Sequence, residues 1–315
     1  MAPNGRARQL AIALASAAAL ALAAWLAWRE GASLQATFST ALQVPVGLLV
    51  AVFGLSLLNY LLRFMRWELL IGPARSRLPR SRHLLIYLAG FSLTLTPAKA
   101  GEALRTVYLL PHGVSAQHSL SCLAVERVLD VMAVALLAAL VVGFWPPGWF
   151  IVAPSLGGTA LTFAFLWWMA QRRVPLVLPV WMPQRLGSAI GSFAQALGTF
   201  GGVTIARTVP LSIAGWGLEA IGLVLLVHHF VPDISALLIV GIFGAAVLGG
   251  ALTFLPGGLG GTELLMVALL TAAGLGGAEA AAVTAVCRLA TLWFGFALGL
   301  CALPLLGARS SAAGS

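Results

Sequence analysis

The hydrophobic positions of this chain form long continuous runs separated by short polar loops. Runs of this kind reach the roughly 20 apolar residues that a helix needs to cross a bilayer. They do not alternate as the strands of a transmembrane barrel do. The pattern therefore predicts an all-α polytopic membrane protein. We expect about six full transmembrane helices, at residues 9–28, 44–70, 119–143, 149–170, 206–230 and 279–305.

Two further apolar stretches are each split into pieces too short to cross a bilayer comfortably. Thr96-Pro97 interrupts the first stretch, and Pro256-Gly257-Gly258 interrupts the second. Irregular backbone is tolerated at membrane depth only where protein or water covers it. We therefore expect two re-entrant broken hairpins. They comprise residues 84–96 with 102–111 and residues 234–255 with 262–275.

The two breaks occupy corresponding places in two halves of the chain. Glu102 follows the first break and Glu263 follows the second. Each glutamate is followed 25 positions later by an arginine, Arg127 or Arg288. Broken, charged segments in corresponding places point to a transporter-type site near the bilayer midplane. The sequence therefore predicts an inverted repeat whose two breaks meet around a shared polar cavity.

Composition and charge indicate where this fold resides. The chain is 60% hydrophobic and only 9% charged, whereas a soluble domain carries about 25% charged residues. Its net charge of +9 is concentrated in arginine clusters within the loops 72–82 and 171–204. Because basic loops stay in the cytoplasm, we expect a multi-pass protein of the cytoplasmic (inner) membrane with both termini cytoplasmic. No basic soluble domain is indicated, so no nucleic acid is expected as a partner.

The chain is expected to form one membrane domain, residues 1–307, with a disordered tail at 308–315. The repeat halves lie at about 44–143 and 206–305. The three cysteines are isolated within apolar stretches, which argues against a disulfide framework or a zinc site. The sequence contains no nucleotide-binding loop, nucleophile elbow or metal-ligand spacing. We therefore expect no ATP hydrolysis, no cofactor, no metal and no catalytic residue.

Charged residues gather after the first break. Glu102 and Arg105 are three positions apart, and Glu126, Arg127 and Asp130 share neighbouring faces of one helix. Two compatible interpretations are open. The charges form ion pairs that lock the hairpin against the following span, or they line a polar cavity for a lipid headgroup.

The two breaks themselves offer groups for an anion. Lys99, the only lysine of the chain, lies in the first break, where a cation could meet a phosphate. Gly257, Gly258 and Gly260 lie in the second break, and glycines let backbone N–H groups approach a ligand closely. The start of the following helix then presents free N–H groups. The alternative is a tight turn that needs only flexibility.

Three arginines need partners within apolar sequence. Arg288 lies deep in the last span and needs an anion, either Glu263 or a lipid phosphate. Glu263 alternatively caps its own helix. Arg63 and Arg66 lie near the predicted cytoplasmic side of the second span, beside Trp67. Snorkelling with aromatic anchoring explains them, and guidance of anionic headgroups is the alternative.

Four motifs together carry a family resemblance. They are Arg-x-x-Arg-Trp at 63–67, Thr-Pro-x-x-x-Gly-Glu at 96–102, Glu-Arg-x-x-Asp at 126–130 and Pro-Gly-Gly-x-Gly-x-x-Glu at 256–263. The chain resembles the lysylphosphatidylglycerol synthase transmembrane-region family, also called flippase-like, over roughly residues 10–305. The resemblance implies a lipid-translocating membrane module. In two-part relatives such a module moves aminoacylated phosphatidylglycerol, which a soluble domain makes. This chain stops at Ser315 without that domain and is not expected to synthesise lysyl-lipid.

The sequence thus predicts a flippase-like transporter that moves an anionic or zwitterionic phospho- or glycolipid without ATP hydrolysis. The alternatives are a membrane enzyme that modifies a lipid, with Glu102 or Glu263 as general base, and a non-transporting partner of such an enzyme. The expected partners are membrane lipids and a lipid-synthesising enzyme. The candidate substrate-binding residues are Arg63, Arg66, Thr96, Lys99, Glu102, Arg105, Glu126, Arg127, Asp130, Gly257, Gly258, Gly260, Glu263 and Arg288.

Overall fold

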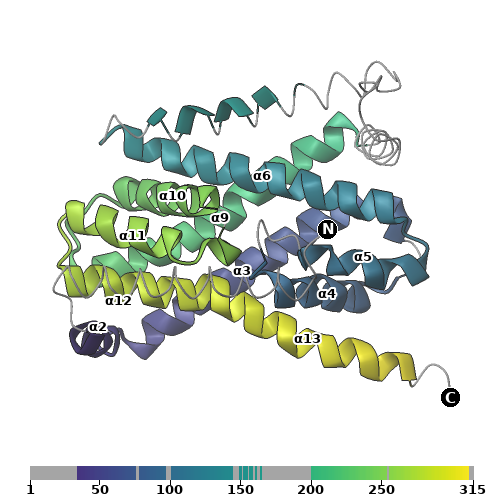
Figure 1. Ribbon diagram of the computed structural model, residues 1–315, viewed down its shortest axis with the longest axis horizontal. Helices are drawn as coiled ribbons and strands as arrows, with labels where there is room; N and C mark the ends of the chain where they lie inside the picture. Colours follow the sequence, from purple (N-terminus) through teal and green to yellow (C-terminus); the bar gives the residue numbers. More distant parts are fainter. Residues whose placement is uncertain are drawn as a thin grey trace, which may run out of the picture.

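A computed structural model gives the arrangement of the helices (Figure 1). It describes residues 34–75, 78–96, 101–144, 200–253 and 255–311, with scattered residues between 149 and 164. These residues form helices and turns and contain no strand. The α-helices are α2 (Leu34–Ala41), α3 (Val46–Ile71), α4 (Arg80–Ala89), α5 (Leu104–Leu109), α6 (Ala116–Val142), α9 (Gly202–Phe230), α10 (Ala236–Leu252), α11 (Gly261–Ala272), α12 (Gly277–Arg288) and α13 (Phe294–Ser311). The shorter turns are η1 (Gly72–Arg75), η2 (Gly90–Leu93), η4 (Leu110–His112), η6 (Pro256–Gly258) and the π-helical η7 (Leu289–Trp293).

Long apolar helices identify a membrane protein. Within the described residues, three helical segments are long and apolar enough to cross a bilayer: Val46–Ala74, Gly202–Phe230 and Gly277–Leu306. Their mean hydropathy lies between 1.8 and 2.0. The prediction of an all-α polytopic membrane protein is confirmed. The predicted spans at 9–28 and, for the most part, 149–170 lie outside the described residues, so the count of six crossings stays a prediction.

The observed helices follow the predicted spans, with two differences. α2 was not predicted, because its eight residues are too few to give a membrane-length apolar run. α13 continues to Ser311, beyond the predicted domain end at residue 307, and residues 312–315 lie outside the described part. The arginine-rich segment 171–199 lies outside it too, so the predicted orientation of the termini stays a prediction.

Two pairs of long helices build the centre of the molecule. α3 packs along α9, and α6 packs along α10 (Figure 1). A Cβ atom added at Gly241 of α10 would meet the backbone of Val141, and one added at Gly244 would meet the backbone of Ala138. Small residues at such places let helices gain close van der Waals contact, which drives association inside a bilayer. The pairing also shows that α6 and α10 are antiparallel.

The buried apolar side chains form two clusters with a polar layer between them. One cluster takes its α6 residues from Ala133 onward, together with residues of α9, α10, α11 and α12. The other takes Leu129 and earlier α6 residues, with side chains of α3, α4 and α13. Asp130 of α6 falls where the two clusters meet, between Leu129 and Ala133, and Glu126 and Arg127 lie about one turn earlier. Each of them therefore needs polar partners from neighbouring helices.

Both predicted breaks interrupt helical structure. α4 with η2 ends at Leu93, and α5 begins at Leu104; α10 ends at Leu252, and α11 begins at Gly261. A Cβ atom added at Gly257 would lie 3.1 Å from Leu95 Cδ2. The flanks of the two breaks are therefore neighbours. Residues 97–100 lie outside the described part, and the re-entrant path and the inverted repeat stay predictions.

Candidate functional site

A connected network of ion pairs fills the polar layer. Arg66 on α3 donates to Glu126 at 3.0 Å and to Asp130 at 2.8 Å, both on α6. Arg105 on α5 donates to Glu126 at 2.8 Å and to Glu102 at 2.7 Å. The Arg66 and Arg105 side chains are 0% and 1% exposed. This network joins α3, α5 and α6. Removal of one partner from a buried ion pair typically costs about 3–5 kcal/mol.

Aromatic rings hold Arg105 in place. Its guanidinium carbon lies 4.0 Å from the centroid of the Tyr87 ring, 5.0 Å from that of Trp67 and 5.6 Å from that of Phe91. A Cβ atom added at Gly90 would collide with the Arg105 side chain. Cation–π contacts in a desolvated site contribute about 2 kcal/mol. Arg105 is thus a buried structural cation that supports Glu102.

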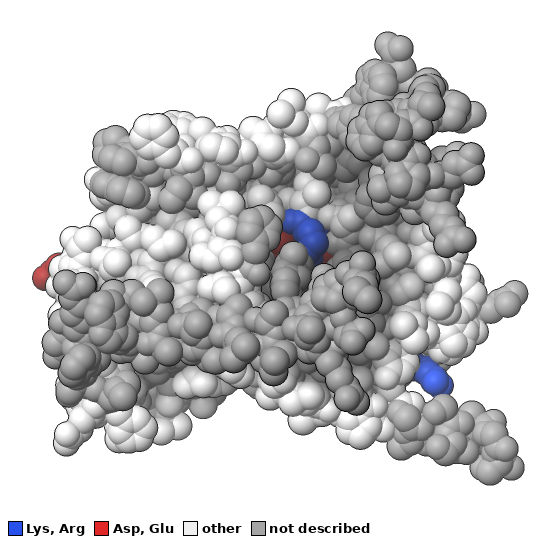
Figure 2. Space-filling view, in the orientation of Figure 1, with Lys and Arg blue, Asp and Glu red and all other residues white. Residues whose placement is uncertain are grey.

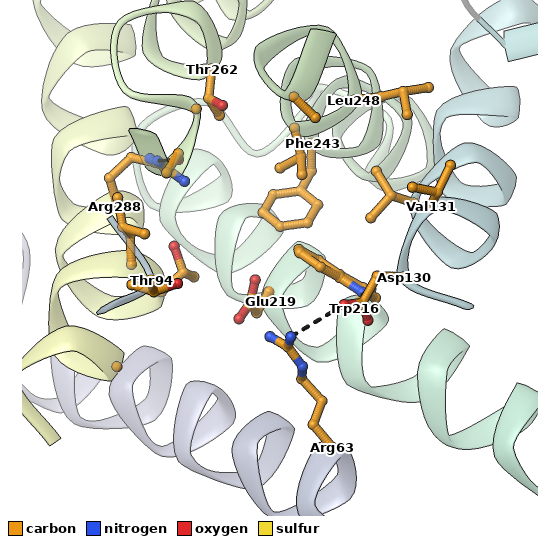
Figure 3. A pocket seen from close by; sticks show the side chains of 18 of the residues that line it. Arg63, Thr94, Asp130, Val131, Trp216, Glu219, Phe243, Leu248, Thr262 and Arg288 are labelled. Carbon is orange, nitrogen blue, oxygen red and sulfur yellow. Dashed lines mark hydrogen bonds and ion pairs between the residues drawn. The ribbon is translucent and has the colours of Figure 1, made fainter. Parts of the chain in front are cut away.

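A cavity of about 300 Å³ lies beside the network (Figure 3). α6, α10 and α11 supply most of an apolar wall. That wall includes Val131, Val134, Phe243, Val247, Leu248, Ala251 and Met266. The remaining lining residues are mainly polar. They include Tyr60, Arg63, Thr94, Glu102, Arg127, Asp130, Trp216, Glu219, Thr262, Arg288 and Thr291.

The second break and the flanks of the first break border this cavity. Thr94 precedes the first break, Glu102 follows it, and Gly257 and Gly258 form part of the second; all four line the cavity, whereas Thr96 does not. That the two breaks themselves meet around a shared polar cavity stays a prediction. Figure 2 shows the same feature from outside. Charged side chains of both signs lie in a hollow in a face that, among the described residues, is almost uncharged.

Three arginines of the cavity have N–H groups that make no hydrogen bond among the described residues. Arg63 and Arg127 use Nη2 for their contacts with Asp130, at 3.3 and 3.0 Å. The Nε atoms of Arg63 and Arg127 are buried and have no hydrogen-bond partner among the described residues, and the same holds for those of Arg66 and Arg105 outside the cavity. Arg288 uses Nε and Nη2, and its Nη1 makes no described hydrogen bond. An unsatisfied buried donor is costly and calls for a physical explanation.

The second break is held by Arg288. Its Nε donates to Glu263 at 2.5 Å, and its Nη2 donates to the Gly257 carbonyl at 2.9 Å. Glu263 also accepts a hydrogen bond from the Gly260 N–H at 2.7 Å. The two roles predicted for Glu263, partner of Arg288 and cap of its helix, are both confirmed. Gly257, Gly258 and Gly260 have φ of 63°, 68° and 83°, which explains why glycine stands at each position.

The comparison with known families agrees with this geometry. The profile described as the lysylphosphatidylglycerol synthase TM region matches residues 9–299 of the 315. The chain belongs to this family. It is also similar to a UPF0104 membrane protein of Methanothermobacter thermautotrophicus, with 38% identity over 103 residues. That similarity covers 33% of this chain and 30% of the relative.

The site of this lysylphosphatidylglycerol synthase TM-region protein divides the predicted residues into two groups. Seven line the cavity: Arg63, Glu102, Arg127, Asp130, Gly257, Gly258 and Arg288. Six others do not line it: Arg66, Thr96, Arg105, Glu126, Gly260 and Glu263. Lys99 lies outside the described residues. The interpretation that Arg63 and Arg66 snorkel is wrong, because the two side chains are 5% and 0% exposed and pair with α6.

Glu219 is a cavity residue that the site prediction missed. It lies on α9, is 5% exposed, and accepts a short hydrogen bond from the side-chain amide of Asn59 on α3. Its occurrence in apolar sequence was a signal, since a carboxylate at membrane depth is costly. Trp216, one turn earlier, donates its indole N–H to Asp130 at 3.0 Å. Neither contact follows from sequence spacing, because the partners lie on other helices.

Tyr60 ties the cavity to the π-helical turn η7. Its hydroxyl donates to the Thr291 carbonyl at 2.6 Å. A π turn leaves backbone carbonyls without their α-helical partners, and such turns are frequent at functional sites. Arg288 is the residue directly before η7. The hydrogen bond from Tyr60 therefore fastens the helix close to the arginine that holds the second break.

Proposed function

We propose that this protein is a flippase-like transporter that moves a lipid with an anionic or zwitterionic headgroup across the cytoplasmic membrane. One observation carries the proposal. Arg63, Arg127 and Arg288, from three different helices, line one cavity. Guanidinium groups donate to phosphate oxygens in a bidentate geometry that lysine cannot match. A headgroup phosphate would satisfy these donors.

The proposed cycle needs no ATP. The headgroup binds the arginines inside the cavity while the acyl chains stay in apolar surroundings. It then leaves toward the other leaflet, down its gradient or with the help of an ion gradient or the membrane potential. The proposal includes cytoplasmic termini, as the basic loops predict, and a lipid-synthesising enzyme as supplier of the lipid.

The contacts of the carboxylates disfavour a lipid-modifying enzyme. Glu102 accepts from Arg105 and Arg127, and Glu263 accepts from Arg288 and Gly260. A general base must be free to take a proton from its substrate. We therefore propose that the protein is not an enzyme.

The test measures lipid exchange in proteoliposomes. Fluorescent phosphatidylglycerol in the inner leaflet is shielded from a membrane-impermeant quencher, so its exposure reports flipping. Purified protein is expected to accelerate that exposure without ATP, and mass spectrometry should recover the lipid unchanged. Exchange equal to that of protein-free liposomes, across several headgroups, would contradict the transporter. A chemically altered lipid would favour the enzyme.

A further inference from the structure

The apolar wall of the cavity continues into a gap between α6 and α10. The glycine contacts fix the register of these antiparallel helices, with Val141 beside Gly241 and Ala138 beside Gly244. Continuing by a step of four and then a step of three places Leu248 opposite Val134 and Ala251 opposite Val131. All four of these residues line the cavity.

The side chains between the two helices become larger along this register. At Gly241 and Gly244 the backbones touch, because no side chain stands between them. At Val134 and Leu248, branched side chains face each other and fill space. The separation of packed helices depends on the side chains at their contact. The cavity therefore lies beyond the close contacts of Gly241 and Gly244 with α6.

The gap also reaches the outside of the described structure. Val131 is 40% exposed, and Ala251 is exposed as well. Leu252, which follows, is 58% exposed. At the inner end, Arg127 lies one helical turn before Val131 and is 25% exposed. An apolar passage therefore runs from the arginines to the surface that faces lipid in a membrane protein. Figure 3 shows Val131 and Leu248 on the side of the cavity opposite Arg288.

We infer that the gap between α6 and α10 is the lateral passage of the acyl chains, which extend from the cavity into the bilayer while the headgroup stays at the arginines. This inference rests on the proposed function and gives the substrate class as a lipid carrying acyl chains. A small water-soluble anion has no need of an apolar passage. Removing apolar chains from lipid would be unfavourable, and the passage makes that removal unnecessary.

The first test fills the gap with a large side chain. Val131→Trp and Ala251→Trp should each slow the flipping of fluorescent phosphatidylglycerol in proteoliposomes by at least about tenfold. Leu140→Trp is the matched control, because Leu140 is an α6 residue of similar exposure, 37%, that does not line the cavity. It should flip lipid at the wild-type rate. Native mass spectrometry should find less phospholipid bound to the two gap variants than to the control.

The second test closes the gap reversibly in folded protein. Cysteines at positions 131 and 251, with Cys301 replaced by serine, are bridged by a bis-methanethiosulfonate, which forms a disulfide with each cysteine and releases methanesulfinate. Bridging should stop flipping, and reductant should restore it in the same sample. If both tryptophan variants and the bridged protein flip lipid as fast as the wild type, the proposed passage is wrong. The proposal of a transporter would be unaffected by that result. Wild-type protein that flips no lipid would overturn both.

Discussion

The two breaks of this protein have corresponding positions but are stabilised by different means. Beside the first break, four arginines and three carboxylates form one network of ion pairs. Its members are Arg63, Arg66, Arg105, Arg127, Glu102, Glu126 and Asp130. At the second break, one pair, Arg288 with Glu263, acts together with three glycines of positive φ. Buried charge therefore fixes the first break, and backbone conformation largely fixes the second. Arg127 and Arg288, each 25 positions after the glutamate of its break, both line the cavity.

The largest expected effect is on folding at the first break. Arg66→Ala leaves Glu126 and Asp130 with less compensation in a buried layer, and should destabilise the protein by about 3–5 kcal/mol. The thermal unfolding midpoint in detergent measures this loss. Arg80→Ala is the matched control, because the Arg80 side chain is 80% exposed, and it should unfold like the wild type. Equal midpoints for both variants would show that the network does not hold the fold.

The second effect separates transport from folding. Arg127→Ala leaves Glu102 with Arg105 and Asp130 with Arg66, so the protein should fold. Flipping should fall by about tenfold or more, because a hydrogen bond to a charged group contributes about 1.5–3 kcal/mol. Lipid exchange at equal amounts of folded protein measures the loss.

The same comparison can be made at the second break. Arg288→Ala leaves Glu263 with the Gly260 N–H, and the double variant Glu263→Gln/Arg288→Ala removes the pair. We expect the double variant to fold with flipping still reduced by about tenfold. A double variant that recovers both folding and flipping would show that this pair serves stability alone.

A smaller effect tests the backbone of the second break. Gly257→Ala forces alanine into φ of 63° and toward Leu95, at a cost of about 1–2 kcal/mol. Gly274→Ala is a control with φ of 110° and no atom within 4 Å of the added Cβ. Both variants should lower the unfolding midpoint, and Gly257→Ala alone should slow flipping. Equal flipping by the two would mean that the break does not shape the cavity.

The smallest effect concerns Glu219, which belongs to neither break. Glu219→Gln keeps an oxygen that can accept from Asn59, so the free energy of unfolding should change by less than about 1 kcal/mol. Glu219→Ala leaves the buried Asn59 amide without this acceptor and should cost more. Thermal unfolding of the two variants side by side measures the difference. A larger loss for glutamine than for alanine would contradict this reading of the hydrogen bond.

Sequence patterns predicted the features that are local or recur at a fixed interval along the chain. The shared spacing of 25 residues anticipated the contact of Glu263 with Arg288 and that of Glu102 with Arg127. The long apolar runs anticipated α3, α9 and the α12–α13 segment. These features are local, or recur at one interval, so hydrophobicity and spacing are enough to find them.

Contacts between distant helices could not be predicted in this way. Arg66 meets Glu126 across 60 positions, and Asn59 meets Glu219 across 160. The sequence shows that each buried charge needs a partner, but the packing of α3 against α6 and α9 decides which partner it meets. The exposure of Val131 likewise depends on how α6 packs against its neighbours.

The π-helical turn η7 also sets the rotational phase of the last long helix. An α-helix advances about 100° per residue, and a π turn accommodates one residue more than an α turn. If Leu289–Trp293 were regular α-helix with the same number of residues, the extra residue would no longer be absorbed within one turn, and Arg288 would be rotated by about 100° relative to α13. The guanidinium would then point away from Gly257 while Gly299 still packed on the η2 backbone. The length of this one turn therefore determines whether the two ends of the helix can face their separate partners at the same time.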